Sequence, residues 1–204
     1  MRVVIISGGT IKDYEFTKQQ LKSDDTIICA DSGYDHAVKM GVKPHILVGD
    51  FDSISCAPED VTQLRHAPEK DLTNTEIAIE YARGRGFRDF LLLGVIGSRI
   101  DHSLTNILLL QHFLEGGENA VIINENNKIM ITNSELELNE LVGSNVSLIP
   151  LTPCEGVTTQ NLKYPLEGAK MLVGKGLGVS NVMLSDHAKL SLQKGTMLVI
   201  VAKD

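Results

Sequence analysis

The chain has 204 residues, of which 19 are Lys or Arg and 26 are Asp or Glu, so its formal net charge is −7. This acidic balance argues against a nucleic-acid-binding protein, because binding to phosphates along a strand requires clustered basic side chains. No apolar run reaches the roughly 18 residues that a membrane-spanning helix needs. Three widely spaced cysteines without a C-x-x-C pair favour a reduced, cytoplasmic protein.

Short aliphatic runs alternate with helical patterns in the first part of the chain. The runs are apolar at consecutive positions, which is typical of strands buried on both faces of a parallel sheet. Strands are predicted at residues 3–7, 26–30, 46–49, 90–93 and 120–123. Helices are predicted at residues 34–40, 73–83 and 101–115. This alternation predicts an α/β fold, an open and mostly parallel sheet with helices on both faces.

The pattern changes after about residue 124, where no long helical pattern remains. Strands are predicted at residues 128–132, 145–149, 170–173, 190–193 and 197–202. The last two are expected to form a hairpin with a turn at Lys194-Gly195. We therefore expect two domains, an α/β domain over residues 1–128 and an all-β sandwich domain over residues 129–204.

Carboxylates follow the predicted parallel strands at their carboxyl ends, where open α/β sheets bind ligands. They are Asp31, Asp50, Asp52 and Asp101. Asp50 and Asp52 are two residues apart in an extended segment and project to the same side. A divalent cation would relieve their mutual repulsion, and Mg²⁺ is the usual choice where carboxylates meet phosphates. The alternative is that Asp50 is solvated and Asp52 caps a turn.

Basic and hydroxyl side chains at the same edge suggest phosphate binding. Arg99 is suited to pair with phosphate through its guanidinium fork, although an ion pair with Asp101 explains it equally well. Lys70 offers a second cation or is a solvated surface side chain. Thr73 opens a T-x-x-E capping box, which is a sufficient structural role. His102 lies in the same loop as Arg99, and its position alone does not establish catalysis.

The order and spacing of these residues resemble the thiamine pyrophosphokinase family. In the first half the matching elements are Ala30-Asp31-Ser32-Gly33, Gly49-Asp50-Phe51-Asp52-Ser53, Lys70-Asp71-Leu72-Thr73, Gly97-Ser98-Arg99-Ile100-Asp101-His102 and Asn106. In the second half they are Leu162-Lys163-Tyr164-Pro165-Leu166 and Gly178-Val179-Ser180-Asn181. The resemblance covers essentially the whole chain.

The resemblance implies transfer of a pyrophosphoryl group from ATP to thiamine, giving thiamine diphosphate and AMP. It implies an α/β catalytic domain that binds ATP and Mg²⁺, followed by a β-sandwich domain for thiamine binding and dimerisation. The protein would be a homodimer with its active site at the subunit interface. No nucleic acid or membrane partner is expected.

The resemblance also implies roles for individual residues. Asp50 and Asp52 would bind Mg²⁺, with Asp31 nearby. The ATP contacts would come from Lys70, Thr73, Asn74, Arg99 and His102, and thiamine contacts from Ser180 and Asn181. The residues expected to take part in catalysis are Asp50, Asp52, Asp71, Arg99 and Asp101. Asp71 and Asp101 are both candidates for a general base.

The sequence departs from the family pattern at two positions. Asn74 stands where the family usually has Asp, and it can coordinate a metal through its carbonyl oxygen but cannot act as a base. Ser98 replaces a common glycine. Two alternatives therefore remain: another Mg²⁺-dependent nucleotidyl or glycosyl transferase with a D-x-D site, or a non-catalytic thiamine or nucleotide sensor of the same fold.

Overall fold

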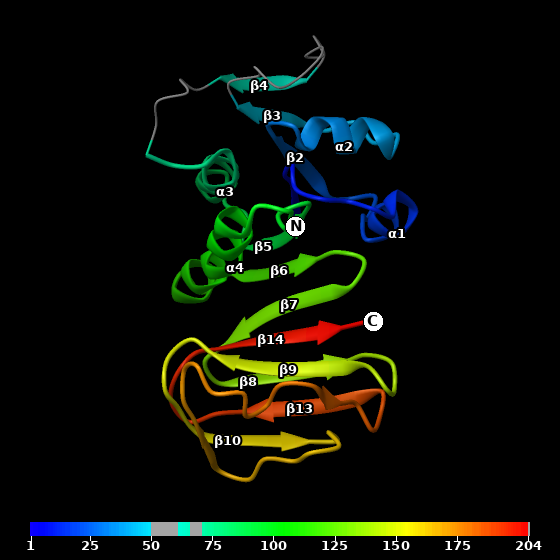
Figure 1. Cartoon of the computed structure of the whole chain (residues 1–204). Helices are drawn as coiled ribbons and strands as arrows, with labels where there is room; N and C mark the ends of the chain where they lie inside the picture. The colour runs from blue at the N-terminus through cyan, green and yellow to red at the C-terminus, as the bar shows by residue number, and fades with distance from the viewer. Residues whose placement is uncertain (50–60, 66–70, 204) are drawn as a thin grey trace. The chain divides into compact units, whose positions relative to one another are not determined.

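A computed structural model describes residues 1–49, 61–65 and 71–203 of the chain. These residues form two compact units, Met1–Glu125 and Asn126–Asp204 (Figure 1). In the described residues, no helix has the length and apolar character required to span a bilayer.

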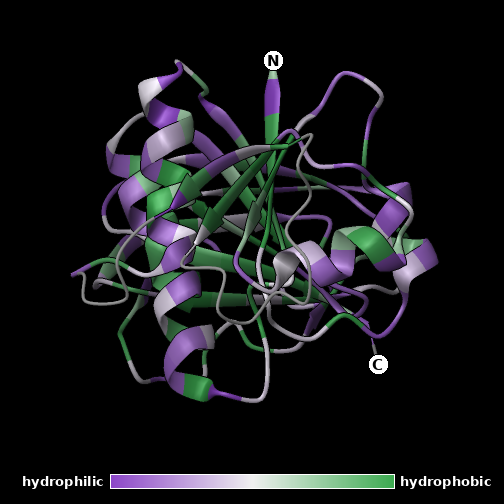
Figure 2. Ribbon diagram, turned by 90° about the horizontal axis from the view of Figure 1, so that it is seen from above, coloured by the Kyte–Doolittle hydropathy of each residue, from purple (hydrophilic) through white to green (hydrophobic). Residues whose placement is uncertain are grey.

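Parallel strands form the sheet of the first unit, in the order β6-β5-β1-β2-β3-β4. Their bounds are β1 Arg2–Ile6, β2 Thr26–Ala30, β3 Ile46–Gly49, β4 Thr62–Arg65, β5 Asp89–Leu93 and β6 Asn119–Ile123. The central strands have the predicted consecutive burial, and Val3 to Ile6 are fully buried. Figure 2 shows the apolar colour of these strands, in contrast to the helices, which carry both hydrophilic and hydrophobic residues.

Helices cover both faces of this sheet, as predicted (Figure 1). Their bounds are α1 Tyr14–Gln19, α2 Gly33–Lys39, α3 Asn74–Gly84 and α4 Ile100–Glu115. Helices α1 and α2 lie on one face, and α3 and α4 lie on the other. The chain builds β1 to β4 in one direction and then returns to place β5 on the other side of β1. This reversal creates a crevice beside the carboxyl end of β1, which is where open α/β sheets bind ligands.

The second unit is the predicted β-sandwich. One sheet has the order β12-β9-β14-β7 and the other has the order β11-β10-β13-β8, with antiparallel neighbours in both. The bounds are β7 Asn127–Thr132, β8 Glu135–Asn139, β9 Asn145–Pro150, β10 Cys154–Gln160, β11 Ala169–Met171, β12 Asn181–Val182, β13 His187–Ser191 and β14 Met197–Ala202. Aliphatic and methionine side chains from both sheets form one core.

The predicted hairpin at Lys194-Gly195 is wrong. Strand β13 pairs with β8 and β10, whereas β14 pairs with β7 and β9, so the two strands belong to different sheets. Gly195 has φ of +105°, and a Cβ there would lie 2.6 Å from the carbonyl oxygen of Pro153. Both segments bury apolar side chains in the same core, and local turn chemistry does not reveal that they approach it from opposite sheets.

Candidate active site

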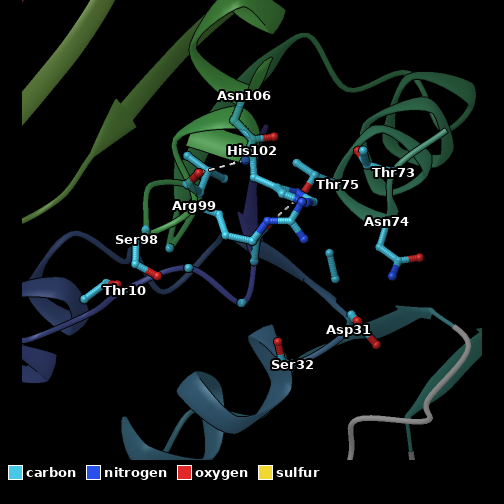
Figure 3. Close-up of a pocket in the computed structure, with 17 residues that line it drawn as sticks. Thr10, Asp31, Ser32, Thr73, Asn74, Thr75, Ser98, Arg99, His102 and Asn106 are labelled. Atoms are coloured by element: carbon cyan, nitrogen blue, oxygen red, sulfur yellow. Dashed lines mark hydrogen bonds between the residues drawn. The ribbon is translucent and has the colours of Figure 1, made fainter. Parts of the chain in front are cut away.

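A cavity of about 400 Å³ lies at the carboxyl ends of β1, β2 and β5 (Figure 3). The loops that follow these strands line it, together with the first turns of α3 and α4. Its position is the crevice created by the reversal of strand order. The cavity therefore lies where the sequence predicted a ligand site.

Backbone forms one wall of this cavity, in the loop after β1. Gly9 N donates to the carbonyl oxygen of Gly94 at 2.6 Å, and Thr10 N donates to that of Ile96 at 2.8 Å. A Cβ on Gly9 would overlap both of these carbonyl oxygens. Gly94 itself has φ of +61°, which only glycine adopts without cost. Glycine is therefore required where these two loops meet, and the resulting wall leaves room for a bulky anion such as a polyphosphate.

Buried side-chain hydrogen bonds hold the loops in place. Ser7 Oγ and Thr75 Oγ1 lie 2.9 Å apart and join the end of β1 to α3. Asn106 Nδ2 donates to Val95 O at 2.7 Å, and Ser103 Oγ donates to Arg99 O at 2.9 Å. These bonds fix the loops that line the cavity relative to one another and to helices α3 and α4.

Sequence reasoning did not predict roles for Thr75 and Ser103. Both are small hydroxyl residues on the buried side of the first turn of a helix. A small hydroxyl residue in the first turn of a helix, next to a glycine-containing loop, is the local pattern that could have predicted these hydrogen bonds. Asn106 was part of the family resemblance, and its burial explains why an amide is needed there.

Asp31 lines the cavity as expected. It follows β2 directly and has φ of +53°, a left-handed conformation that Asp tolerates better than most residues. Its backbone N donates to Val48 O at 2.8 Å, which ties it to the end of β3. Gly49, the last described residue before Asp50, lies against the Asp31 side chain. The sequence therefore continues from a point next to Asp31 into the Asp50 and Asp52 segment.

Arg99 and His102 both line the cavity (Figure 3). Arg99 donates to the Asp101 carboxylate from Nε at 3.2 Å and from Nη2 at 2.5 Å. This hydrogen bonding by Arg99 lowers the pKa of Asp101 from 3.8 to about 2 and raises the pKa of Arg99. The side chains of Arg99 and Asp101 are 70% and 64% exposed, so the guanidinium remains accessible to a ligand. A carboxylate with so low a pKa is a poor general base.

The start of α3 contributes Thr73, Asn74 and Thr75 to the cavity. Thr73 Oγ1 accepts from Glu76 N at 3.2 Å and Thr73 N donates to Glu76 Oε2 at 2.8 Å, so the capping box is present. Asn74 points its amide toward the cavity (Figure 3). Asp71 precedes the helix, is exposed, and lies outside the lining of the cavity.

The expected metal and phosphate residues Asp50, Asp52 and Lys70 lie outside the described residues. Over the described ranges, no group of three His, Cys, Asp or Glu side chains could hold a metal ion. The oxygen donors that line the cavity, including Asp31 and Asn74, are of the type that Mg²⁺ prefers. The donor chemistry thus fits Mg²⁺, but the described residues do not by themselves complete a site.

Ser180 and Asn181 lie in the second unit, at the start of β12. Ser180 has φ of +57°, and its N donates to Ser147 Oγ at 3.1 Å. Asn181 is only 3% exposed, and its amide accepts from Tyr164 N at 2.9 Å and donates to Tyr164 O at 2.7 Å. Asn181 therefore holds the loop that contains Tyr164 in place. The ring of Tyr164 is exposed.

Comparison with known proteins identifies the family. The family model described as thiamin pyrophosphokinase, catalytic domain, matches residues 17–122, and that described as thiamin pyrophosphokinase, vitamin B1 binding domain, matches residues 127–197. This chain belongs to the thiamin pyrophosphokinase family. The resemblance seen in the sequence is confirmed.

Individual thiamin pyrophosphokinases are similar over most of their length. Thiamine pyrophosphokinase of Bacillus subtilis (strain 168) is 27% identical over 186 residues, which cover 87% of each protein. Thiamine pyrophosphokinase 1 of Oryza sativa subsp. japonica is 24% identical, covering 92% of this chain and 74% of that protein. Membership in the thiamin pyrophosphokinase family makes this chain an enzyme that transfers pyrophosphate.

Solved structures of thiamin pyrophosphokinases share the fold. The crystal structure of thiamine pyrophosphokinase from Bacillus subtilis matches with a TM-score of 0.90 at 23% identity and covers 100% of both chains. The structure of thiamin pyrophosphokinase from Geobacillus thermodenitrificans matches with a TM-score of 0.88 at 25% identity, covering 100% of this chain and 98% of that one. The predicted fold class, an α/β domain followed by a β-sandwich, is confirmed.

Proposed function

We propose that this enzyme transfers the pyrophosphoryl group of ATP to the hydroxyethyl oxygen of thiamine in a Mg²⁺-dependent reaction. The observation that carries the proposal is the cavity after β1, β2 and β5, where a glycine-lined backbone wall faces an accessible Arg99. This combination suits a polyphosphate, because backbone can approach it closely while a guanidinium neutralises its charge.

In the proposed reaction the thiamine hydroxyl oxygen attacks the β-phosphorus of ATP. The bond from that phosphorus to the oxygen shared with the α-phosphorus breaks, and AMP leaves with the electron pair. Arg99, Lys70 and the backbone wall would hold the phosphates, and Arg99 would stabilise charge that develops as the bond breaks. Thr73, Asn74 and His102 would contact ATP from the two helix N-termini.

Asp50 and Asp52, with Asp31 beside them, would hold Mg²⁺. When bound, Mg²⁺ would supply neutralisation of the phosphate oxygens and fix their orientation. Asp71 and Asp101 are both candidates to accept the hydroxyl proton: the ion pair with Arg99 lowers the pKa of Asp101, and Asp71 lies outside the cavity lining.

The α/β domain over residues 1–128 would bind ATP and Mg²⁺, and the sandwich domain over residues 129–204 would bind thiamine and mediate dimerisation. Ser180 and the loop organised by Asn181 would contribute to the thiamine site, with the active site completed at the interface of a homodimer. Sedimentation velocity should then give a species of twice the chain mass of 22.2 kDa. Cys29 and Cys154 are buried free thiols, which suits the reducing cytoplasm.

The deciding experiment is incubation of the purified protein with ATP, MgCl₂ and thiamine, followed by chromatographic detection of AMP and thiamine diphosphate. We expect both products in equal amounts, and neither when thiamine or MgCl₂ is omitted. Nucleotide turnover independent of thiamine would instead indicate another nucleotidyl or glycosyl transferase. Ligand binding without AMP release would indicate a sensor, the alternative raised by Asn74.

A further inference from the structure

His36 connects helix α2 to the backbone wall of the cavity. Its Nε2 lies 2.8 Å from the carbonyl oxygen of Gly9, and its Nδ1 lies 2.9 Å from Tyr14 Oη. Tyr14 and His36 also pack against each other, with ring centroids 5.7 Å apart. Gly9 lines the cavity, whereas His36 lies outside its lining. The Gly9 carbonyl is therefore bound by a group behind the wall.

The chemistry of these contacts fixes the direction of the hydrogen bonds. A carbonyl oxygen only accepts, so the hydrogen in the contact with Gly9 must be on Nε2 of His36. In the neutral ring Nδ1 then carries a lone pair and accepts from the Tyr14 hydroxyl. The Gly9 carbonyl thereby selects the ring form, and the Tyr14 hydroxyl, which can donate or accept, holds the ring through Nδ1.

The peptide that joins Gly9 to Thr10 is held at both ends. Its carbonyl accepts from His36, and its N–H, on Thr10, donates to Ile96 O at 2.8 Å. Without the donor from His36, little besides the Thr10 bond would oppose rotation of this peptide, because glycine has broad backbone freedom. Rotation would turn a carbonyl dipole toward the cavity, where its negative end would repel a phosphate.

We propose that His36, oriented by Tyr14, is a positioning residue that keeps the Gly9 carbonyl turned away from the polyphosphate of the substrate. This inference rests on the proposed function, because it assumes that a polyphosphate lies against the wall. It assigns a role in the reaction to two residues that do not touch the substrate. The role is exercised through the backbone of Gly9.

Two substitutions of similar polarity separate positioning from bulk. His36→Gln places an amide N–H at about the reach of Nε2, whereas the shorter His36→Asn places it near Nδ1. We expect the KM for ATP and the Kd for ATP measured by calorimetry to rise about 5- to 10-fold in His36→Asn and His36→Ala, the effect of losing one hydrogen bond. His36→Gln should remain within about 2-fold of the unmodified enzyme, and kcat should change less than KM in all three.

His45 provides the matched control. Its Nδ1 accepts from Ile27 N at 3.0 Å, so it also binds backbone, but at the opposite end of β2 from the cavity. His45→Ala should leave the KM and Kd for ATP unchanged even if it lowers the melting temperature. A loss of ATP affinity equal to that of His36→Ala would overturn the inference, because both would then reflect general destabilisation.

The ring form is tested directly by the ¹⁵N NMR shifts of the His36 ring. We expect the hydrogen of the neutral ring on Nε2, and in Tyr14→Phe, where the ring loses its support at Nδ1, a smaller rise in KM for ATP than in His36→Ala. A hydrogen on Nδ1, or equal ATP affinity in His36→Gln and His36→Asn, would overturn the inference. Failure of the proposed function gives a different result, since the unmodified enzyme would then form no AMP or bind no ATP.

Discussion

The guanidinium of Arg99 and the carboxylate of Asp101 form a two-point ion pair, with Nε–Oδ1 and Nη2–Oδ2 distances of 3.2 and 2.5 Å. The two residues are two positions apart where α4 begins, so the pair is built locally. The sequence alone is compatible with Arg99 pairing either with phosphate or with Asp101. In the structure Arg99 pairs with Asp101, and its exposure leaves it available to phosphate as well.

The first prediction concerns the titration of Asp101. Hydrogen bonding by Arg99 lowers its pKa from 3.8 to about 2, so the pair is fully formed above the ordinary pKa and is lost only as pH falls through about 2. The carboxyl ¹³C NMR signal of Asp101 should remain at its ionised position down to about pH 3. Arg99→Gln should move the midpoint back toward 3.8. A midpoint near the ordinary value in the unmodified enzyme would contradict the pairing.

The second prediction separates the roles of Arg99 and Asp101 in catalysis. Arg99→Ala should lower kcat/KM by at least about 10²-fold, the scale of losing one group that stabilises developing charge. Asp101→Asn should cost less than about 10-fold, since the amide oxygen still accepts from Arg99 and the carboxylate is too weak a base. Steady-state kinetics with thiamine and ATP would measure both.

Arg88 is the control for Arg99, because it is an exposed arginine at the amino end of β5, away from the cavity. Arg88→Ala should leave kcat/KM unchanged. If Asp101→Asn proves as damaging as Arg99→Ala, Asp101 takes a direct part in proton transfer.

The third prediction tests the expected metal residues. Asp52→Asn should lower kcat by at least about 10²-fold, because it removes a charged oxygen from the proposed Mg²⁺ site while preserving side-chain size. Circular dichroism should show an unchanged fold. Asp89→Asn, an exposed Asp at the amino end of β5, should retain full activity. Near-normal turnover in Asp52→Asn would exclude Asp52 from the metal site.

The fourth prediction concerns Asn74, where the family usually has Asp. Asn74 lines the cavity together with Asp31, so a carboxylate at position 74 would add charge close to the proposed metal. Asn74→Asp should lower the MgCl₂ concentration that gives half-maximal activity by several-fold. Asn119→Asp, at the amino end of β6 and therefore at the opposite end of the parallel strands from the cavity, should leave it unchanged. An unchanged MgCl₂ dependence in Asn74→Asp would place this residue outside the metal site.

The sequence predicted the parts of the fold that depend on burial. Strands β1, β2, β3 and β5 are buried on both faces, which requires continuous aliphatic runs that are easily recognised. Strand β4, Thr62–Arg65, lies at an edge and is mostly polar, so no apolar pattern marks it. Helix α1 has only six residues, too few for a helical period to be visible, although Asp13 does cap it.

The sequence predicted the polar residues at the rim of the candidate site, but not the hydrogen bonds that hold the backbone of the rim in place. Asp31 and Arg99 follow strands at their carboxyl ends, and the topology of a parallel sheet brings such positions together. The contacts of His36 depend on partners 22 and 27 residues away in the chain, so no local pattern reveals them. Whether Lys194-Gly195 forms a hairpin turn likewise depends on which sheet β13 and β14 each join. That choice is set by the whole sandwich and not by the local sequence.

The fifth prediction concerns the glycine at the junction of the cavity loops. In Gly94→Ala the new side chain would meet two costs, a left-handed φ of +61° and overlap with the carbonyl oxygen of Ser7. We expect a loss of about 2–4 kcal/mol in the free energy of unfolding of the first unit, measured by urea titration. Any folded fraction should also show a raised KM for ATP, because the loop after β1 must move away from the loop after β5.

Two other glycines separate the two costs. Gly117 has φ of +66° but open space around its Cβ position, so Gly117→Ala should cost only about 1 kcal/mol, the backbone contribution alone. Gly84 ends α3 with an ordinary φ and open space, so Gly84→Ala should be neutral or stabilise by up to about 1 kcal/mol. If Gly94→Ala costs no more than Gly117→Ala, the two loops are free to separate, and the wall that they form is not the rigid support required for a bound polyphosphate.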